Sequence, residues 1–413
     1  MRRTSALLLL APSLAMGSDY QTAARKAGKW LDAQKLADSP NLYSGTSGVA
    51  LYYLELYRAT GDKAALTKLE SIGDSLLAGA KSEKSQGLYS GSAGVGFVLT
   101  EIWKSTKQNR FRDGAVAIVD GIRATAQPAN GGVAWGDSTD IISGVSGIGL
   151  YLLYAARELN LPAAKETAAQ AGTALIARGK KTEHGIEWPM DSKFPRMMPN
   201  FSHGTAGVAY FLATLYQDTK RKEFLDASLA GARHLLSIAD KENDRCEIYH
   251  HTPDGLDLYY LGWCHGPTGT ARLFYQLYKT TNDKEWLTWF ARSGNTLMNA
   301  GIPEKETPGF WNNVGQCCGS AGVGEFSLAL YRITKDKKYL DFAKRLTANL
   351  LTRATADGDG LKWIHAEHRV QPANVQAQTG YMQGAAGIGV WLLRLDEAER
   401  GKPSALRFPD SPY

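Results

Sequence analysis

Three cysteines in two glycine-rich segments could support metal chemistry. Cys317 and Cys318 are adjacent in GQCCGSAGVGEF, and Cys264 lies in GWCHGPTG. Thiolates bind zinc and other soft divalent metals, and a zinc ion with three protein ligands keeps a fourth tetrahedral position free for a substrate. In an oxidising compartment, however, the 4 cysteines of the chain could instead form two disulfides. Composition alone leaves both interpretations open.

A histidine and an aspartate in two similar segments could take part in proton transfer. His203 lies in NFSHGTAG, and Asp140 lies in DIISGVSG. A histidine can donate or accept a proton near neutral pH, and a nearby carboxylate can orient or polarise it. Taken alone, Asp140 could equally cap the helix that follows it, and His203 could be structural. A catalytic role therefore depends on whether these residues meet the cysteines in space.

All of these segments are copies of one repeated unit. A Gly-x-x-Gly motif followed by an apolar run occurs seven times, with first glycines Gly45, Gly91, Gly144, Gly204, Gly266, Gly319 and Gly384. Self-similarity of this kind indicates a repeat architecture. The apolar runs suit helices buried on most sides, the stretches between them are amphipathic, and no sustained alternation typical of strands appears. We therefore predict an all-α fold of about fourteen helices, two per repeat, closed into a seven-repeat α/α toroid.

Residues at one offset from the first glycine should form a ring at one end of such a toroid. The position two before the glycine holds Tyr43, Tyr89, Ile142, Ser202, Cys264, Cys317 and Met382, and the position one before holds Ser44, Ser90, Ser143, His203, His265, Cys318 and Gln383. This register brings three cysteines together and adds His203 to the same rim, so we favour zinc over a disulfide. Cys246 falls outside the ring and is predicted to be an ordinary buried or loop thiol. The glycines would let the inner helices begin close to their neighbours.

The rest of the sequence narrows the class of protein. MRRTSALLLLAPSLAMGSDY has the charged, apolar and small-residue order of a secretory signal peptide. We expect residues 1–17 to be removed, a single domain over 18–413, and a secreted or periplasmic monomer, or a cytoplasmic one if the N-terminus is not cleaved. The net charge of +6 comes without a concentrated basic run, which argues against nucleic acid as a partner. No stretch is long and apolar enough to span a membrane.

The segments resemble, in order, those of the lanthionine synthetase C (LanC-like) family, zinc cyclases with a seven-fold double-layered α/α toroid. The resemblance covers nearly everything after residue 17. It implies that Cys264, Cys317 and Cys318 bind Zn²⁺, that His203 is the acid/base residue, and that Asp140 is the active-site aspartate. It also implies that a zinc-held thiol adds to a dehydroalanine or dehydrobutyrine in a dehydrated peptide, after which His203 protonates the enolate. The product would be a thioether.

The chain departs from the family pattern in two places. Cys318 stands where most members have histidine, which implies an all-thiolate site, and DLYYLGW lacks the arginine that some members carry, so the anion-stabilising role is unassigned. WCHG is similar to members that handle glutathione, so the thiol could come from cysteine or glutathione, and His265 would lie behind the ligands or face solvent. Two alternatives stay open: an exported carbohydrate-active α/α-toroid enzyme, which would need paired carboxylates, and a non-catalytic protein that binds zinc and thiols.

Overall fold

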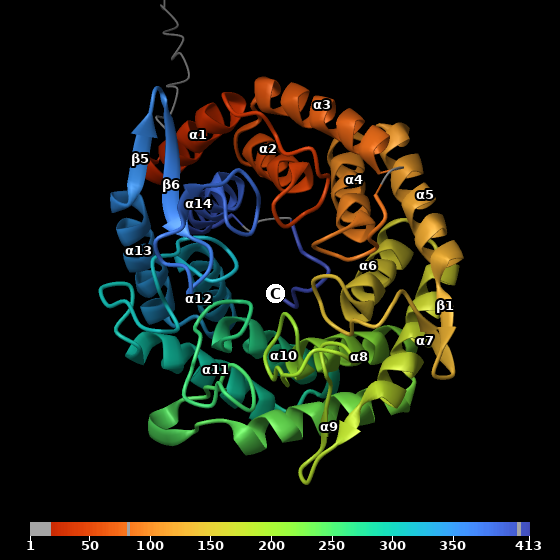
Figure 1. Cartoon of the computed structure of the whole chain (residues 1–413). Coiled ribbons are helices and arrows are strands. Elements are labelled where there is room, and N and C mark those ends of the chain that lie inside the picture. Colours follow the sequence, from red (N-terminus) through yellow and green to blue (C-terminus); the bar gives the residue numbers. More distant parts are fainter. Residues whose placement is uncertain (1–17, 81–82, 403–405) are drawn as a thin grey trace, which may run out of the picture.

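The helices form two concentric rings (Figure 1). The computed structural model describes residues 18–80, 83–402 and 406–413, so the predicted signal peptide lies outside the described residues. The inner ring consists of α2 (Thr46–Thr60), α4 (Ser92–Thr106), α6 (Val145–Glu158), α8 (Thr205–Thr219), α10 (Pro267–Thr281), α12 (Ser320–Thr334) and α14 (Ala385–Glu399). The outer ring consists of α1 (Asp19–Asp32), α3 (Lys63–Gly79), α5 (Asn109–Thr125), α7 (Pro162–Arg178), α9 (Lys222–Ile238), α11 (Lys284–Asn299) and α13 (Lys337–Thr352). The predicted all-α toroid is confirmed.

Burial explains the difference between the two rings. In α6, every residue from Val145 to Ala155 is buried, as expected for a helix with neighbours on all sides. In α13, burial recurs at three- and four-residue spacing, for example at Tyr339, Phe342 and Leu346, so the helix packs on one side only. The sequence pattern therefore assigns each helix to its layer.

The ring closes with a helix from the other end of the chain. α14 is the inner helix of the seventh repeat, and its outer partner is α1, which precedes the first repeat in sequence. Within this junction, the Tyr52 hydroxyl of α2 donates a hydrogen bond to the carbonyl of Ala24 in α1 at 2.7 Å. The predicted number of helices is correct, but the seventh pair joins the two ends of the described chain.

Short antiparallel sheets interrupt the helical pattern, and the sequence analysis did not predict them. They are β1 (Gln127–Ala129) with β2 (Gly132–Ala134), β3 (Lys180–Lys181) with β4 (Ile186–Glu187), and β5 (Ala354–Asp357) with β6 (Gly360–Ala366) and β7 (Val375–Ala377). Asn130 and Gly131, with φ of 48° and 79°, form the turn of the first hairpin. Asn-Gly is the preferred dipeptide for such a turn, and it was the local signal available.

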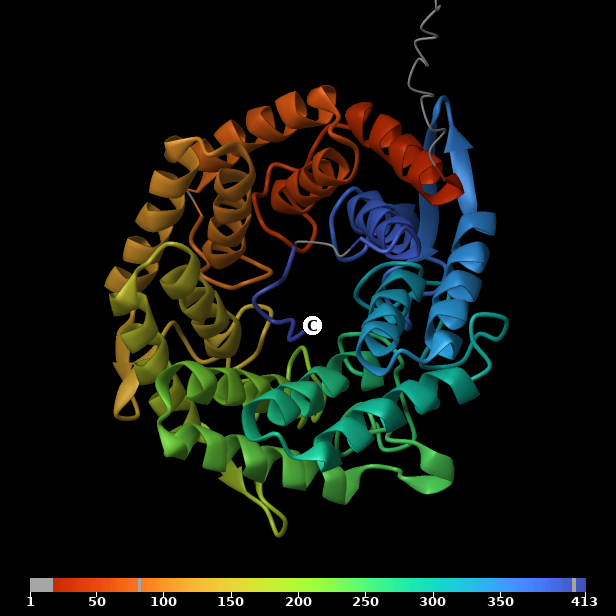
Figure 2. The same ribbon diagram turned by 180° about the vertical axis from the view of Figure 1, so that it is seen from behind.

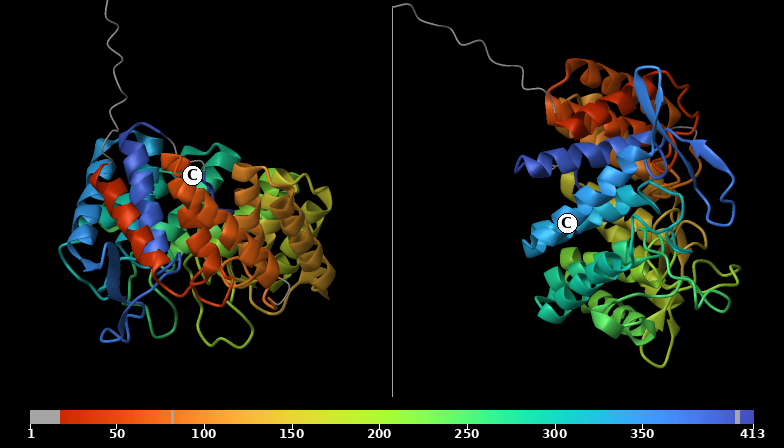
Figure 3. Two further views of the ribbon diagram at one scale, coloured as in Figure 1. Left: turned by 90° about the horizontal axis from the view of Figure 1, so that it is seen from above. Right: turned by 90° about the vertical axis from the view of Figure 1, so that its left-hand side faces the viewer.

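Main-chain hydrogen bonds join the repeats at one end of the toroid. In each repeat, one backbone amide just before the first glycine donates a hydrogen bond to a main-chain carbonyl of the next repeat. The donor is two positions before the glycine, except in the third repeat, where it is three positions before. The donors are Tyr43, Tyr89, Ile141, Ser202, Cys264, Cys317 and Met382, at distances of 2.9, 2.9, 3.0, 2.9, 3.3, 3.0 and 2.9 Å. The last of these amides returns to Tyr43, so the ring is closed. The loops that lead into the inner helices gather on this face, which we call the rim (Figure 3).

The glycines of the motif serve the loop of their own repeat first. A Cβ at Gly204 would lie 1.6 Å from the carbonyl oxygen of Met198, six residues earlier. At Gly207 it would lie 2.1 Å from the carbonyl oxygen of Phe201 and 2.7 Å from Ile141 of the neighbouring repeat. The predicted contact between neighbours exists at Gly207, but the tighter restriction comes from the loop that folds back over the helix start.

Among the described residues, no helix is long and apolar enough to cross a membrane.

Candidate metal centre

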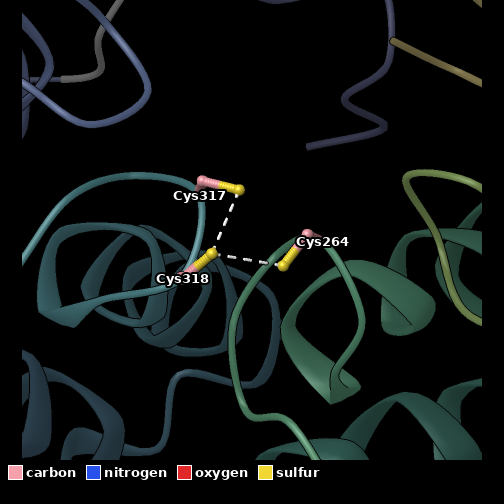
Figure 4. Close-up of side chains that lie close together, drawn as sticks. All are labelled: Cys264, Cys317 and Cys318. Atoms are coloured by element: carbon pink, nitrogen blue, oxygen red, sulfur yellow. Dashed lines mark hydrogen bonds between the residues drawn. The ribbon is translucent and has the colours of Figure 1, made fainter. Parts of the chain in front are cut away.

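Three buried thiols converge on the rim (Figure 4). The Sγ atom of Cys318 lies 3.2 Å from that of Cys317 and 3.3 Å from that of Cys264. Within the described residues, these three form the one group of cysteine, histidine and carboxylate ligands close enough to share a metal ion, with all ligand atoms within 4.8 Å of one another. Cys246 is also buried but does not belong to this group. The structure therefore brings together the three cysteines that the register predicts.

The donor set fits zinc. Three sulfurs around a tetrahedral zinc, with Zn–S bonds of about 2.3 Å, lie about 3.8 Å apart. The observed separations of 3.2 and 3.3 Å require each sulfur to move outward by only a few tenths of an ångström. Two of the cysteines come from the loop before α12 and the third from the loop before α10, and main-chain hydrogen bonds of the rim fix both loops.

The thiols are electrostatically unequal before any metal binds. Hydrogen bonds from Cys264 and Cys318, and a further one from the Tyr43 hydroxyl, lower the pKa of Cys317 well below its usual value. The pKa values of Cys264 and Cys318 are raised, chiefly because their hydrogen bonds favour the protonated thiol. Of the three thiols, that of Cys317 therefore gives up its proton to a metal most readily.

His203 and Asp140 form a hydrogen-bonded pair on the same rim. The Nδ1 atom of His203 lies 2.6 Å from Oδ2 of Asp140. Oδ1 of Asp140 accepts hydrogen bonds from the amides of Ser143 and Gly144 at 2.9 and 2.6 Å, so this carboxylate both fixes the loop that leads into α6 and orients the imidazole. Burial favours the neutral ring, but the hydrogen bond and charge of Asp140 outweigh it, and the pKa of His203 is raised. The imidazole side chain is 27% exposed, so a substrate can reach it.

The structure places His265 beside two residues that the sequence did not reveal as neighbours of the site, His250 and Tyr260. The ring of His265 lies between those of His203 and His250, at centroid distances of 5.5 and 4.1 Å, and Tyr260 contacts His250 at 4.3 Å. His265 is only 6% exposed, so the expectation that it could face solvent is wrong. Burial lowers the pKa of His265 and brings that of His250 to about 3, so both rings are neutral at physiological pH.

An arginine side chain contacts Tyr260, one of these aromatic neighbours. Nε of Arg369, in the loop between β6 and β7, donates a hydrogen bond to the Tyr260 hydroxyl at 3.3 Å. Tyr260 falls in DLYYLGW, the segment without an arginine, so the positive charge comes from a distant part of the chain. That loop lies outside the repeated Gly-x-x-Gly segments, so the repeat alignment could not place Arg369 near the site.

Comparison with known proteins identifies the family. The family model described as "Lanthionine synthetase C-like protein" matches residues 37–407. The chain belongs to the lanthionine synthetase C-like family. A similar relative, the protein named glutathione S-transferase LANCL1 of Danio rerio, is 26% identical over 147 residues, which is 34% of this chain and 32% of that protein. The match thus spans only about a third of the length of that curated relative.

Solved structures share the toroid. Nisin cyclase superposes with a TM-score of 0.66 at 15% identity, and the alignment covers 92% of this chain and 94% of nisin cyclase. An unsaturated glucuronyl hydrolase specific for heparin has a TM-score of 0.52 at 12% identity, with 93% and 99% of the two chains covered. At such identities the likeness establishes the fold alone. This chain therefore shares its fold with a carbohydrate-active enzyme as well as with nisin cyclase.

Proposed function

We propose that this LanC-like protein is a zinc-dependent enzyme that joins a thiol to a dehydroamino acid in a peptide to form a thioether. The observation that carries the proposal is the shared rim of two groups: three buried thiols that fit one metal ion, and the His203–Asp140 pair. The amide of Ser202 donates a hydrogen bond to the carbonyl of Cys264 at 2.9 Å, and the rings of His203 and His265 lie 5.5 Å apart, so the two groups sit on adjoining loops.

Cys264, Cys317 and Cys318 would hold the zinc, with a fourth position left for the substrate. Zinc bound there would favour the thiolate form of the substrate thiol near neutral pH. The three ligand residues are 4%, 3% and 7% exposed, so they also exclude water from the sulfur side of the site. A drier site strengthens the electrostatic interactions on which the addition depends.

His203 would supply the proton that completes the addition. A new bond joins the thiolate sulfur to the β-carbon, the C=C π electrons move to form an enolate, and Nε2–H of His203 protonates the α-carbon. Asp140 accepts a hydrogen bond from Nδ1, which fixes the tautomer and directs Nε2 away from the carboxylate. The proton released by the substrate thiol restores the imidazolium, so the reaction is balanced.

Two sources of thiol fit the site. The names of nisin cyclase and of the Danio rerio relative support a cysteine within the peptide and glutathione, respectively. We therefore propose a dehydrated peptide as the acceptor and either thiol as the donor. Arg369, which is hydrogen-bonded to Tyr260, offers a positive charge for an anionic part of the substrate.

The test is incubation of the purified, zinc-loaded protein with a dehydroalanine peptide and each thiol. We expect a product heavier by one glutathione, or a cyclised peptide when the cysteine is internal, formed faster than without protein. Adduct formation no faster than the uncatalysed reaction, together with tight glutathione binding, would instead favour the non-catalytic thiol-binding protein. Activity on unsaturated glycosides would favour the carbohydrate-active enzyme, although the two ring positions that precede the glycines contain no carboxylate.

We also propose export, with a mature chain that begins near Ser18. The support is the charged, apolar and small-residue order of the first 17 residues. Mass spectrometry of protein from the native cell should find Met1 absent. Retention of Met1, or residence in the cytosol, would contradict export without affecting the proposed chemistry.

A further inference from the structure

A segment after α14 occupies the centre of the toroid. Leu406–Tyr413, here called the central segment, lies among the inner helices and reaches the middle of the ring (Figures 1 and 2). The match to the family model ends at residue 407, so most of this segment lies outside the matched residues. The proposed reaction assigns it no role.

Contacts with four different repeats anchor the central segment. The ring of Phe408 lies 5.1 Å from that of Phe97 and 4.9 Å from that of Tyr381, and the ring of Tyr413 lies 5.6 Å from that of Tyr275 and 6.3 Å from that of Phe326. A cavity of about 60 Å³ is left between the segment and the residues below the rim, including Trp263 and Met382. The segment thus fills the ring beneath the metal centre.

Asp410 makes the polar contacts of this segment. It is fully buried, and its carboxylate lies 2.7 Å from Nη1 of Arg272 in α10. It also accepts a hydrogen bond from the Tyr89 hydroxyl at 3.1 to 3.2 Å. A buried carboxylate requires such partners, because removing its charge from water is otherwise unfavourable. Asp410 therefore fixes the position of both Arg272 and Tyr89.

Both partners of Asp410 contact Trp263, the residue before Cys264. The rings of Tyr89 and Trp263 lie 5.1 Å apart, and the Arg272 guanidinium lies 5.9 Å from the centroid of the Trp263 ring. Trp263 is 2% exposed and also packs against Phe201, whose centroid lies 5.9 Å away. Two separate routes thus lead from Asp410 to the indole that supports the first cysteine of the metal centre.

We propose that the central segment is the floor of the metal centre and that Asp410 is a positioning residue for Cys264. By holding Tyr89 and Arg272 against Trp263, Asp410 limits the movement of the Cys264 backbone and keeps its sulfur in register with Cys317 and Cys318. The inference rests on the proposed function, because it takes Cys264 to be a metal ligand. It extends the site to a segment outside the family model.

The first test compares Asp410→Ala and Asp410→Asn with a matched control, Glu101→Gln. Like Asp410, Glu101 is a buried carboxylate bound by an arginine and a tyrosine hydroxyl, those of Arg58 and Tyr154, but none of its described hydrogen bonds or ion pairs involves Trp263 or the central segment. In the cobalt-loaded protein, we expect Asp410→Ala to weaken the sulfur-to-cobalt absorption and to release the metal to a chelator about tenfold faster. Asp410→Asn, which can still accept hydrogen bonds, should recover part of the loss, and Glu101→Gln should change neither.

The second readout needs no metal. In metal-free protein, alkylation of Cys264 should become several-fold faster in Asp410→Ala, while alkylation of Cys246, a buried thiol outside the metal centre, should not. Equal acceleration at both cysteines, or unchanged cobalt spectra and metal release in Asp410→Ala, would overturn the inference. A wild-type protein that binds no metal would refute the proposed function, and the alkylation ratio would still show whether Asp410 holds Cys264 in place.

Discussion

Neighbouring repeats are joined by different kinds of contact at the two ends of the inner helices. At the rim, main-chain hydrogen bonds such as Cys264 to Cys317 connect the repeats. At the opposite end, side chains connect them: Arg58 of α2 pairs with Glu101 of α4 at 2.8 Å, and Lys104 of α4 pairs with Glu158 of α6 at 2.9 Å. Because the backbone closes the rim, side chains there are free to vary from repeat to repeat. Chemistry can therefore reside at the rim, while the opposite end depends on ion pairs between its side chains to join the repeats.

Removal of His203 should have the largest effect on catalysis. Without its general acid, His203→Ala should form thioether about 10²- to 10⁴-fold more slowly. Zinc content should not change, because His203 is not one of the three ligands. Rates come from mass spectrometry of the adduct, and zinc comes from elemental analysis. His368→Ala, which removes an imidazole from the exposed loop between β6 and β7, is the control. Loss of zinc in His203→Ala would make His203 a ligand.

Asp140→Asn should reduce the rate by about 10- to 100-fold and shift its pH dependence. Asp140 raises the pKa of His203 through its hydrogen bond and charge. A general acid must be protonated, so the wild-type rate falls as pH rises through this raised pKa. In the variant the pKa is lower, so the fall should begin at lower pH. If kcat falls over the same pH range in both proteins, proton donation by His203 is ruled out.

Cys318→His tests how the charge of a third thiolate ligand affects the reactivity of the substrate sulfur. Three thiolates and a substrate thiolate give a zinc centre a total charge of −2, whereas an imidazole in place of one thiolate gives −1. The lower negative charge should make the bound sulfur less nucleophilic, so we expect zinc binding to persist and the rate to fall about tenfold, or ~1.4 kcal/mol of barrier. Unchanged rates and zinc content in both Cys318→His and Cys318→Ser would remove Cys318 from the site.

The opposite end should tolerate a comparable change with no effect on the reaction. Glu101 is 1% exposed and is bound by Arg58, Lys104 and the Tyr154 hydroxyl. Glu101→Gln should destabilise the fold by about 2 kcal/mol, because Arg58, Lys104 and the Tyr154 hydroxyl each lose a hydrogen bond to a buried charged group. Thermal unfolding measures this loss. The rate per folded molecule should equal that of the wild type, and a matching fall in rate would show that the two ends are coupled.

The repeats made much of the fold and part of the site predictable. A fixed register places Cys264, Cys317 and His203 on one rim whatever the lengths of the loops between them, so sequence alone could group them. His250 and Arg369 lie in loops of irregular length that share no register with other repeats, and only the structure brings them to the site. The sequence likewise could not predict that α1 closes the outer ring or where Asp410 lies, because each depends on a contact that no repeat pattern specifies.

Zinc analysis of the purified protein, combined with X-ray absorption at the zinc edge, tests the proposed metal centre most directly. We predict about one zinc per chain, bound by three protein sulfurs at ~2.3 Å, and its loss in Cys264→Ser. Glutathione should add a fourth sulfur. A protein without metal whose rim cysteines are oxidised to disulfides, or a zinc with histidine nitrogen among its ligands, would contradict the account.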